Sequence, residues 1–118
     1  MTKRTFDTLT DKIAFLSFRE QLLFDNDEVS RILFEYEVNE QESRAIMDLM
    51  DSYRVKLDRQ EPVSHSKFES EVYAIVPHLN GDYHFCEALT KAFHDENRWE
   101  EVFTALYSEL PKYRNIID

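Results

Sequence analysis

The stretch "NGDYHFCEALTKAFH", residues 80–94, combines the clearest turn signal of the chain with one apolar side of a predicted helix. Gly81 is the only glycine of the 118 residues, and an Asn-Gly pair is typical of a turn because both residues tolerate a positive φ. Asp82 follows where its carboxylate can accept hydrogen bonds from the free N–H groups of a helix start. Phe85 and Phe93 then lie on one side of that helix. We therefore predict a turn followed directly by a helix.

His84 and Cys86, in the same stretch, raise the question of a metal site or a reactive thiol. Residues two apart on a helix point about 200° away from each other, so the two side chains cannot bind one metal ion. A zinc site needs further donors, and Cys86 is the only cysteine. Cysteine catalysis needs a base and oxyanion donors, which no spacing in the sequence identifies. We expect Cys86 in the core, and we predict no catalytic residue, no cofactor and no metal ligand.

Apolar residues elsewhere in the chain also follow the helical period, and no segment alternates with the period of a strand. A single glycine excludes a glycine-rich phosphate loop. We predict an all-α fold: a single compact helical domain, residues 1–118, of five to six short helices packed around an apolar helix. The chain ends, 1–7 and 112–118, are expected to fray.

Polar residues that can cap a helix start precede most of the predicted helices. In chain order, the predicted caps are the acidic run Asp25–Glu28, Asn39 with Glu42, Ser66 with Glu69, Asp82, and Asn97 with Glu100.

The first predicted helix, from about residue 9 to residue 24, is apolar on two sides. One side consists of Leu9, Ile13, Leu16 and Leu23, and the other of Phe15, Phe18 and Leu22. Such a helix is either surrounded by its neighbours or packs against a second chain. We predict that the second side, Phe15, Phe18 and Leu22, forms a self-interface.

The chain is strongly acidic, with 24 Asp and Glu against 14 Lys and Arg and a net charge of −10. Residues 25–51 alone carry nine acids and two bases. Direct binding to nucleic acid is not expected, since neutralising phosphates requires Lys and Arg. Contact with a basic partner surface is allowed, and we predict Glu28, Glu35 and Glu42 as part of such an interface.

One cysteine excludes an intrachain disulfide, and no stretch approaches the roughly 20 apolar residues of a membrane span. We expect a cytoplasmic protein without membrane contact. The sequence does not show whether the protein binds a small molecule.

Four segments carry a resemblance to a known family: "DKIAFLSFREQLL" (11–23), "VNEQESRAIMDLMDSY" (38–53), "HLNGDYHFCEAL" (78–89) and "RWEEVFTALY" (98–107). Together they resemble the YhaI-like family of small helical proteins from Bacillus and its relatives. The resemblance implies a bacterial all-α protein but no activity and no site residues, because the family is a domain of unknown function. The chain departs from the family pattern at Pro62-Val63-Ser64-His65, which replaces a glycine-containing turn.

Three classes of function are compatible with these patterns. The leading hypothesis is a non-enzymatic protein-interaction or regulatory module that contacts a protein partner or a second copy of itself. The alternative is an acidic inhibitor that mimics nucleic acid in the basic groove of a DNA-binding protein. The third hypothesis is a cysteine- or metal-dependent enzyme centred on Cys86 and His84.

Overall fold

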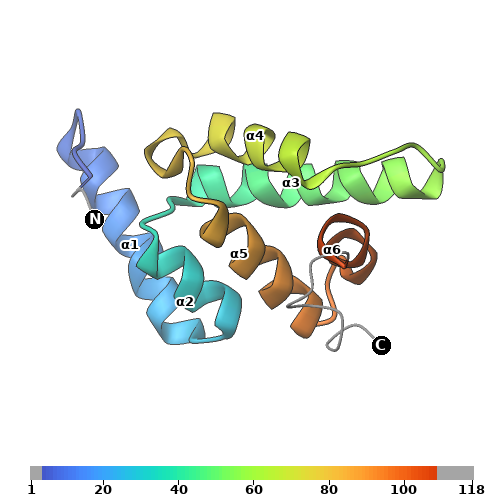
Figure 1. Ribbon diagram of the computed structural model, residues 1–118. Helices are drawn as coiled ribbons and strands as arrows, with labels where there is room; N and C mark the ends of the chain where they lie inside the picture. Colours follow the sequence, from blue (N-terminus) through green and yellow to red (C-terminus); the bar gives the residue numbers. More distant parts are fainter. Residues whose placement is uncertain (1–3, 109–118) are drawn as a thin grey trace.

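A computed structural model describes residues 4–108 of the chain, and this part is all-helical (Figure 1). The described residues form six α-helices and one short 3-10 helix, with no strand among them. In chain order these are α1 (Leu9–Asp25), α2 (Glu28–Glu35), α3 (Glu40–Asp58), α4 (His65–Ile75), η1 (Pro77–Leu79), α5 (Tyr83–Asp95) and α6 (Glu100–Tyr107). The prediction of an all-α fold is confirmed. The predicted frayed end at 112–118 lies outside the described residues.

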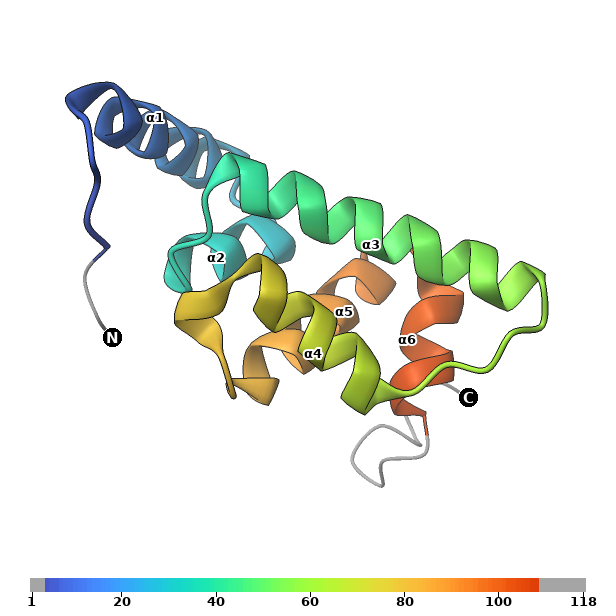
Figure 2. The same ribbon diagram turned by 90° about the horizontal axis from the view of Figure 1, so that it is seen from above.

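Helix α5 occupies the centre of the described structure, and α1 lies at one end. α5 packs against α2, α4 and α6 and lies between them in both views (Figures 1 and 2). Seven of its 13 residues are buried. α1, the helix that is apolar on two sides, packs along α2 and leaves its other side open (Figure 2).

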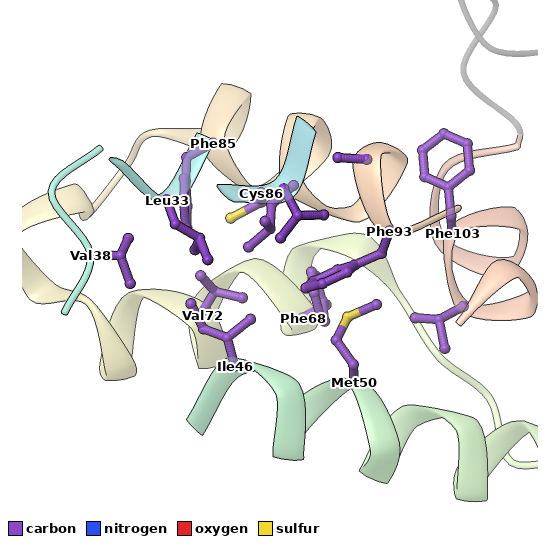
Figure 3. Packing of buried hydrophobic residues seen from close by; sticks show 14 of the residues in the cluster. Leu33, Val38, Ile46, Met50, Phe68, Val72, Phe85, Cys86, Phe93 and Phe103 are labelled. Atoms are coloured by element: carbon purple, nitrogen blue, oxygen red, sulfur yellow. The ribbon is translucent and has the colours of Figure 1, made fainter. Parts of the chain in front are cut away.

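The largest part of the core lies where α3, α4, α5 and α6 meet, and Val29 and Leu33 of α2 belong to the same cluster. Figure 3 shows Phe93 of α5 pointing toward Phe68 of α4 and Met50 of α3, and all three side chains are buried. Full burial of a large apolar side chain contributes about 1.5–3 kcal/mol. This shared apolar cluster is therefore the main force that holds the four helices together.

The turn and helix start predicted at residues 80–94 are present. Gly81 has a φ of 86°, a backbone conformation that residues with a side chain rarely adopt. The Asp82 carboxylate accepts a hydrogen bond of 3.2 Å from the Phe85 N–H and caps α5. The prediction of a turn followed directly by a helix is confirmed.

Two further predicted caps are present. Asn39 and Glu42 form a capping box: the Asn39 side chain accepts from the Glu42 N–H at 2.8 Å, and Glu42 accepts from the Asn39 N–H at 3.0 Å. Within the acidic run before α2, Asp27 accepts from the Ser30 N–H at 2.7 Å. Both contacts join residues three apart in the chain, which explains why sequence patterns indicate them.

The predicted cap of α4 is wrong by two residues. Ser64, not Ser66, is the cap, and its hydroxyl accepts from the Lys67 N–H at 3.3 Å. Glu69, the expected partner of Ser66, instead accepts a hydrogen bond of 2.8 Å from the Tyr107 hydroxyl of α6. A tertiary contact has therefore taken the carboxylate that a capping box would need.

The predicted cap of α6 is also wrong. Trp99 occupies the cap position with a φ of 50°, and no side chain caps this helix. The Trp99 ring packs edge-on against Phe93, with ring centroids 4.9 Å apart, and its N–H donates to Asp51 at 2.8 Å. These contacts hold the indole in place, and α6 begins directly after Trp99 rather than after Asn97.

From Arg4 onward, the segment before α1 contacts the rest of the structure, whereas residues 1–3 of the predicted frayed end 1–7 lie outside the described residues. The Arg4 guanidinium donates to the Glu42 carboxylate at 2.6 Å and to the Glu37 carbonyl at 2.8 Å. The ring of Phe6 lies 5.1 Å from that of Phe15. These contacts hold residues 4–7 against α1 and the start of α3.

Candidate interaction surface

One side of α1 faces α2 and is used within the chain. Phe15 and Leu22 are only 8% and 5% exposed, and Phe18 packs half-buried against the core. These residues recur at helical spacing and therefore form a single inward stripe.

Arg19 fixes the pairing of α1 with α2. Its guanidinium lies 3.7 Å from the centroid of the Phe34 ring and 5.3 Å from that of Phe15. The same group donates a hydrogen bond of 2.8 Å to the Phe34 carbonyl, near the end of α2. A cation over an aromatic ring is stabilising, and a cation is also favoured at the negative end of a helix. Arg19 therefore holds the inward side of α1 against α2.

The opposite side of α1 is open and apolar. Five of the seven large apolar side chains that are exposed in residues 4–108 lie on this helix. They are Leu9 (73% exposed), Ile13 (54%), Leu16 (53%), Leu23 (61%) and Phe24 (83%). At 100° per residue all five fall within about 100° of the helix circumference. We call these five residues the outer face of α1.

The interface predicted on α1 therefore needs correction. Phe15, Phe18 and Leu22 were expected to face a second copy, but they face α2 and the N-terminal segment of their own chain. The reason is that Phe15 and the α2 ring of Phe34 share the Arg19 guanidinium. The sequence showed two apolar sides and could not rank them; only α2 decides which one remains open.

The three carboxylates predicted as an interface do not form one array. Glu28 and Glu35 are exposed on α2. Glu42 is 12% exposed, pairs with Arg4 at 2.6 Å and closes the capping box with Asn39. Glu42 is therefore occupied within the chain, which leaves two of the three carboxylates open to a partner.

Cys86 and His84 do not form a joint site. Cys86 is 1% exposed, whereas His84 is exposed on the other side of α5. Burial, and then the charge of Glu69, raise the pKa of the Cys86 thiol to about 12. The thiol is therefore neutral at physiological pH, and a neutral thiol is a poor nucleophile. The prediction that Cys86 is a core residue is confirmed.

Two buried tyrosines hold α4 in the bundle, an arrangement that the sequence did not reveal. The Tyr107 hydroxyl donates to Glu69 at 2.8 Å, and the Tyr53 hydroxyl donates to Glu71 at 2.5 Å. Burial, together with these carboxylates, raises the pKa of both tyrosines. The partners are 38 and 18 residues apart in the chain, so no local spacing could have indicated them. This network is structural, because each tyrosine hydroxyl donates a hydrogen bond to a carboxylate of α4.

A surface hollow of about 370 Å³ lies between the N-terminal segment, α1 and the start of α3. Its lining mixes carboxylates (Asp7, Asp11 and Glu40) with the phenyl rings of Phe6 and Phe15.

Within residues 4–108, no group of three His, Cys, Asp or Glu side chains is arranged to hold a metal ion. In the same range, no helix combines the length and apolar character needed to cross a membrane.

The fold and this surface define an all-α protein with one open apolar helix face. Comparison with protein-family models, with curated proteins and with solved structures finds no match to the chain. The resemblance to the YhaI-like family stays a prediction, and the function has to be argued from the surface itself.

Proposed function

We propose that this chain is a non-enzymatic protein-interaction module that binds a protein through the outer face of α1. The observation that carries the proposal is the concentration of exposed large apolar side chains on α1. This helix lies at the end of the molecule (Figure 2). Contiguous exposed apolar patches are uncommon on monomeric proteins and mark sites of association.

A protein partner fits this face better than a membrane surface does. Helices that lie on membranes carry Lys and Arg along the edges of the apolar face. α1 carries two bases: Arg19 is directed toward Phe34 of the same chain, so Lys12 is the only exposed base of this helix. Glu20 lies in the same angular sector as the apolar residues and is exposed. A carboxylate in the middle of the face opposes contact with lipid, whereas a protein can supply a cation to it.

The size of the face suits a reversible interaction. Burying the exposed parts of the five side chains contributes on the order of 5–10 kcal/mol. Association costs an estimated 4–15 kcal/mol in lost freedom of motion. The two terms are comparable, so a single α1 face supports moderate affinity rather than a permanent complex.

Photo-crosslinking from the outer face tests the proposal directly. A benzophenone amino acid would replace Ile13 in the full chain, expressed in the organism that encodes it. A matched probe would replace Val55, an exposed apolar residue on α3. We expect a discrete crosslinked protein adduct from position 13, lost when Leu16→Glu is added, and none from position 55. Equal labelling from the two positions would contradict the proposal.

A further inference from the structure

The apolar residues of the outer face are spaced as in helices that pack lengthwise on another helix. Leu9, Ile13, Leu16 and Leu23 follow the alternating four- and three-residue steps of such a seam, and Glu20 occupies the remaining position. α1 has 17 residues and is therefore about 25 Å long. It lies at the end of the molecule, so a second helix can approach along its whole length (Figures 1 and 2).

Glu20 and Lys12 are the two charges that identify the partner. Both are exposed, and within residues 4–108 the structure gives neither side chain an ion-pair partner. Eight residues of helix separate them by about 12 Å, so they cannot pair with each other on one helix. A partner that covers this seam must therefore offer a cation opposite Glu20 and an anion opposite Lys12.

A second copy of α1, run antiparallel, meets this requirement. When the two-fold axis passes through Leu16, each residue of one helix lies opposite the residue of the second copy that is equally far from Leu16 in the other direction along the chain. Leu9 then lies opposite Leu23 of the second copy, and Lys12 lies opposite Glu20 of the second copy. The symmetry of the dimer forms each of these pairs twice. A parallel pair would instead place Lys12 against Lys12 and Glu20 against Glu20, which is repulsive.

We infer that the chain forms a symmetric homodimer through antiparallel α1 helices centred on Leu16. This inference rests on the proposed function and names the partner of the same face. One helix pair is smaller than the roughly 1,600 Å² of a standard stable interface. The dimer is therefore reversible, with a dissociation constant on the order of 1–100 μM.

Sedimentation equilibrium of the purified full chain, with charge-swapped variants, tests the partner and its direction. Lys12→Glu and Glu20→Lys each place like charges across the axis twice and should weaken the dimer about tenfold at low salt. The double variant, and a mixture of the two single variants, both restore opposite charges and should associate nearly as well as the wild type. Leu16→Glu should be monomeric, whereas the matched control Val55→Glu should dimerise normally. Circular dichroism confirms that each variant keeps its helices.

The outcomes separate this inference from the proposed function. A wild-type chain that stays monomeric to about 500 μM would overturn the homodimer, because the expected constant lies well below that concentration. Association of the single variants as tight as that of the wild type would overturn the antiparallel register. If the Ile13 probe then gave an adduct of a mass other than twice 14.2 kDa, the interaction function would stand with a different partner. Absence of any adduct would remove both.

Discussion

The fold should lose stability steeply in alkali, because three buried groups must stay protonated in the native state. Burial comes first and a neighbouring carboxylate second in raising the pKa of each. Cys86, next to Glu69, is raised to about 12. Tyr107 and Tyr53 are raised above their ordinary 10.0 by burial and by the carboxylates to which they donate, Glu69 and Glu71.

The direction and size of the effect follow from proton linkage. A group whose pKa is raised by folding stabilises fully below its unfolded pKa, here 9.0 for the cysteine and 10.0 for the tyrosines. Above that pH the unfolded chain releases the proton and the native chain does not, which costs about 1.4 kcal/mol per group and per pH unit. These three groups together should lower the free energy of unfolding by about 4 kcal/mol per pH unit above pH 10, and Tyr73, whose pKa is also raised by burial, adds to this loss. A total stability of about 5–15 kcal/mol is then exhausted within a few pH units.

Urea unfolding followed by circular dichroism at 222 nm, from pH 7 to pH 11, measures this slope. Tyr107→Phe removes one of the three groups and its hydrogen bond to the Glu69 carboxylate. The variant should be less stable by about 1.5–3 kcal/mol at pH 7. Above pH 10 it should lose about 1.4 kcal/mol less per pH unit than the wild type, so the two curves converge. Tyr83→Phe, at an exposed tyrosine of α5, is the matched control and should follow the wild type.

Parallel stability curves for Tyr107→Phe and the wild type above pH 10 would refute the reasoning. They would mean that the Tyr107 hydroxyl ionises equally well in the native and unfolded states and is therefore not sequestered. A steeper loss of stability with pH in the variant would also refute the reasoning. Removing a titrating group cannot increase the number of protons released on unfolding.

The remaining predictions concern the turn, the core and a helix start, all measured by urea unfolding. Gly81→Ala should lower the free energy of unfolding by about 1 kcal/mol. The loss comes from the positive φ of +86° and not from a steric clash, because an added Cβ meets nothing within 4 Å. Gly81→Asn should lower the free energy of unfolding by less, since Asn tolerates a positive φ better than Ala. Phe93→Ala should cost about 3–5 kcal/mol and Val55→Ala no more than about 0.5 kcal/mol; equal losses would contradict the burial that we describe. Burial alone would raise the pKa of Asp27, but the hydrogen bonds from Ser30, the charge of Arg98 and a hydrogen bond with Glu96 together outweigh it and hold the pKa below 3.8. The stability that Asp27 contributes is therefore present above about pH 4 and lost as the pH falls below it, and Asp27→Asn, which keeps the capping oxygen, should flatten this acid loss.

Local features of the fold could be predicted because their causes lie within a few residues of one another. The turn at Gly81, the cap at Asp82 and the capping box of Asn39 with Glu42 each join groups at most three residues apart. Helical periodicity also placed Phe85 and its neighbours on a buried side of α5. None of these depends on which other helix lies nearby.

Predictions failed where a distant contact competed with a local one. Glu69 could have capped α4, but the Tyr107 hydroxyl of α6 holds it. Asn97 could have capped α6, but the Trp99 ring, held by Phe93 and Asp51, sets where that helix begins. In both cases the deciding contact is with a residue far away in the chain, which the local sequence pattern does not include.

The candidate site divides in the same way. The sequence by itself determined that the first helix has two apolar sides, because that depends only on 3.6 residues per turn. Tertiary structure decided which side stays open. Arg19 stacks on Phe34 of α2 and so turns Phe15 inward. Leu16 and the rest of the outer face are left exposed because, within residues 4–108, α2 packs against the other side of α1.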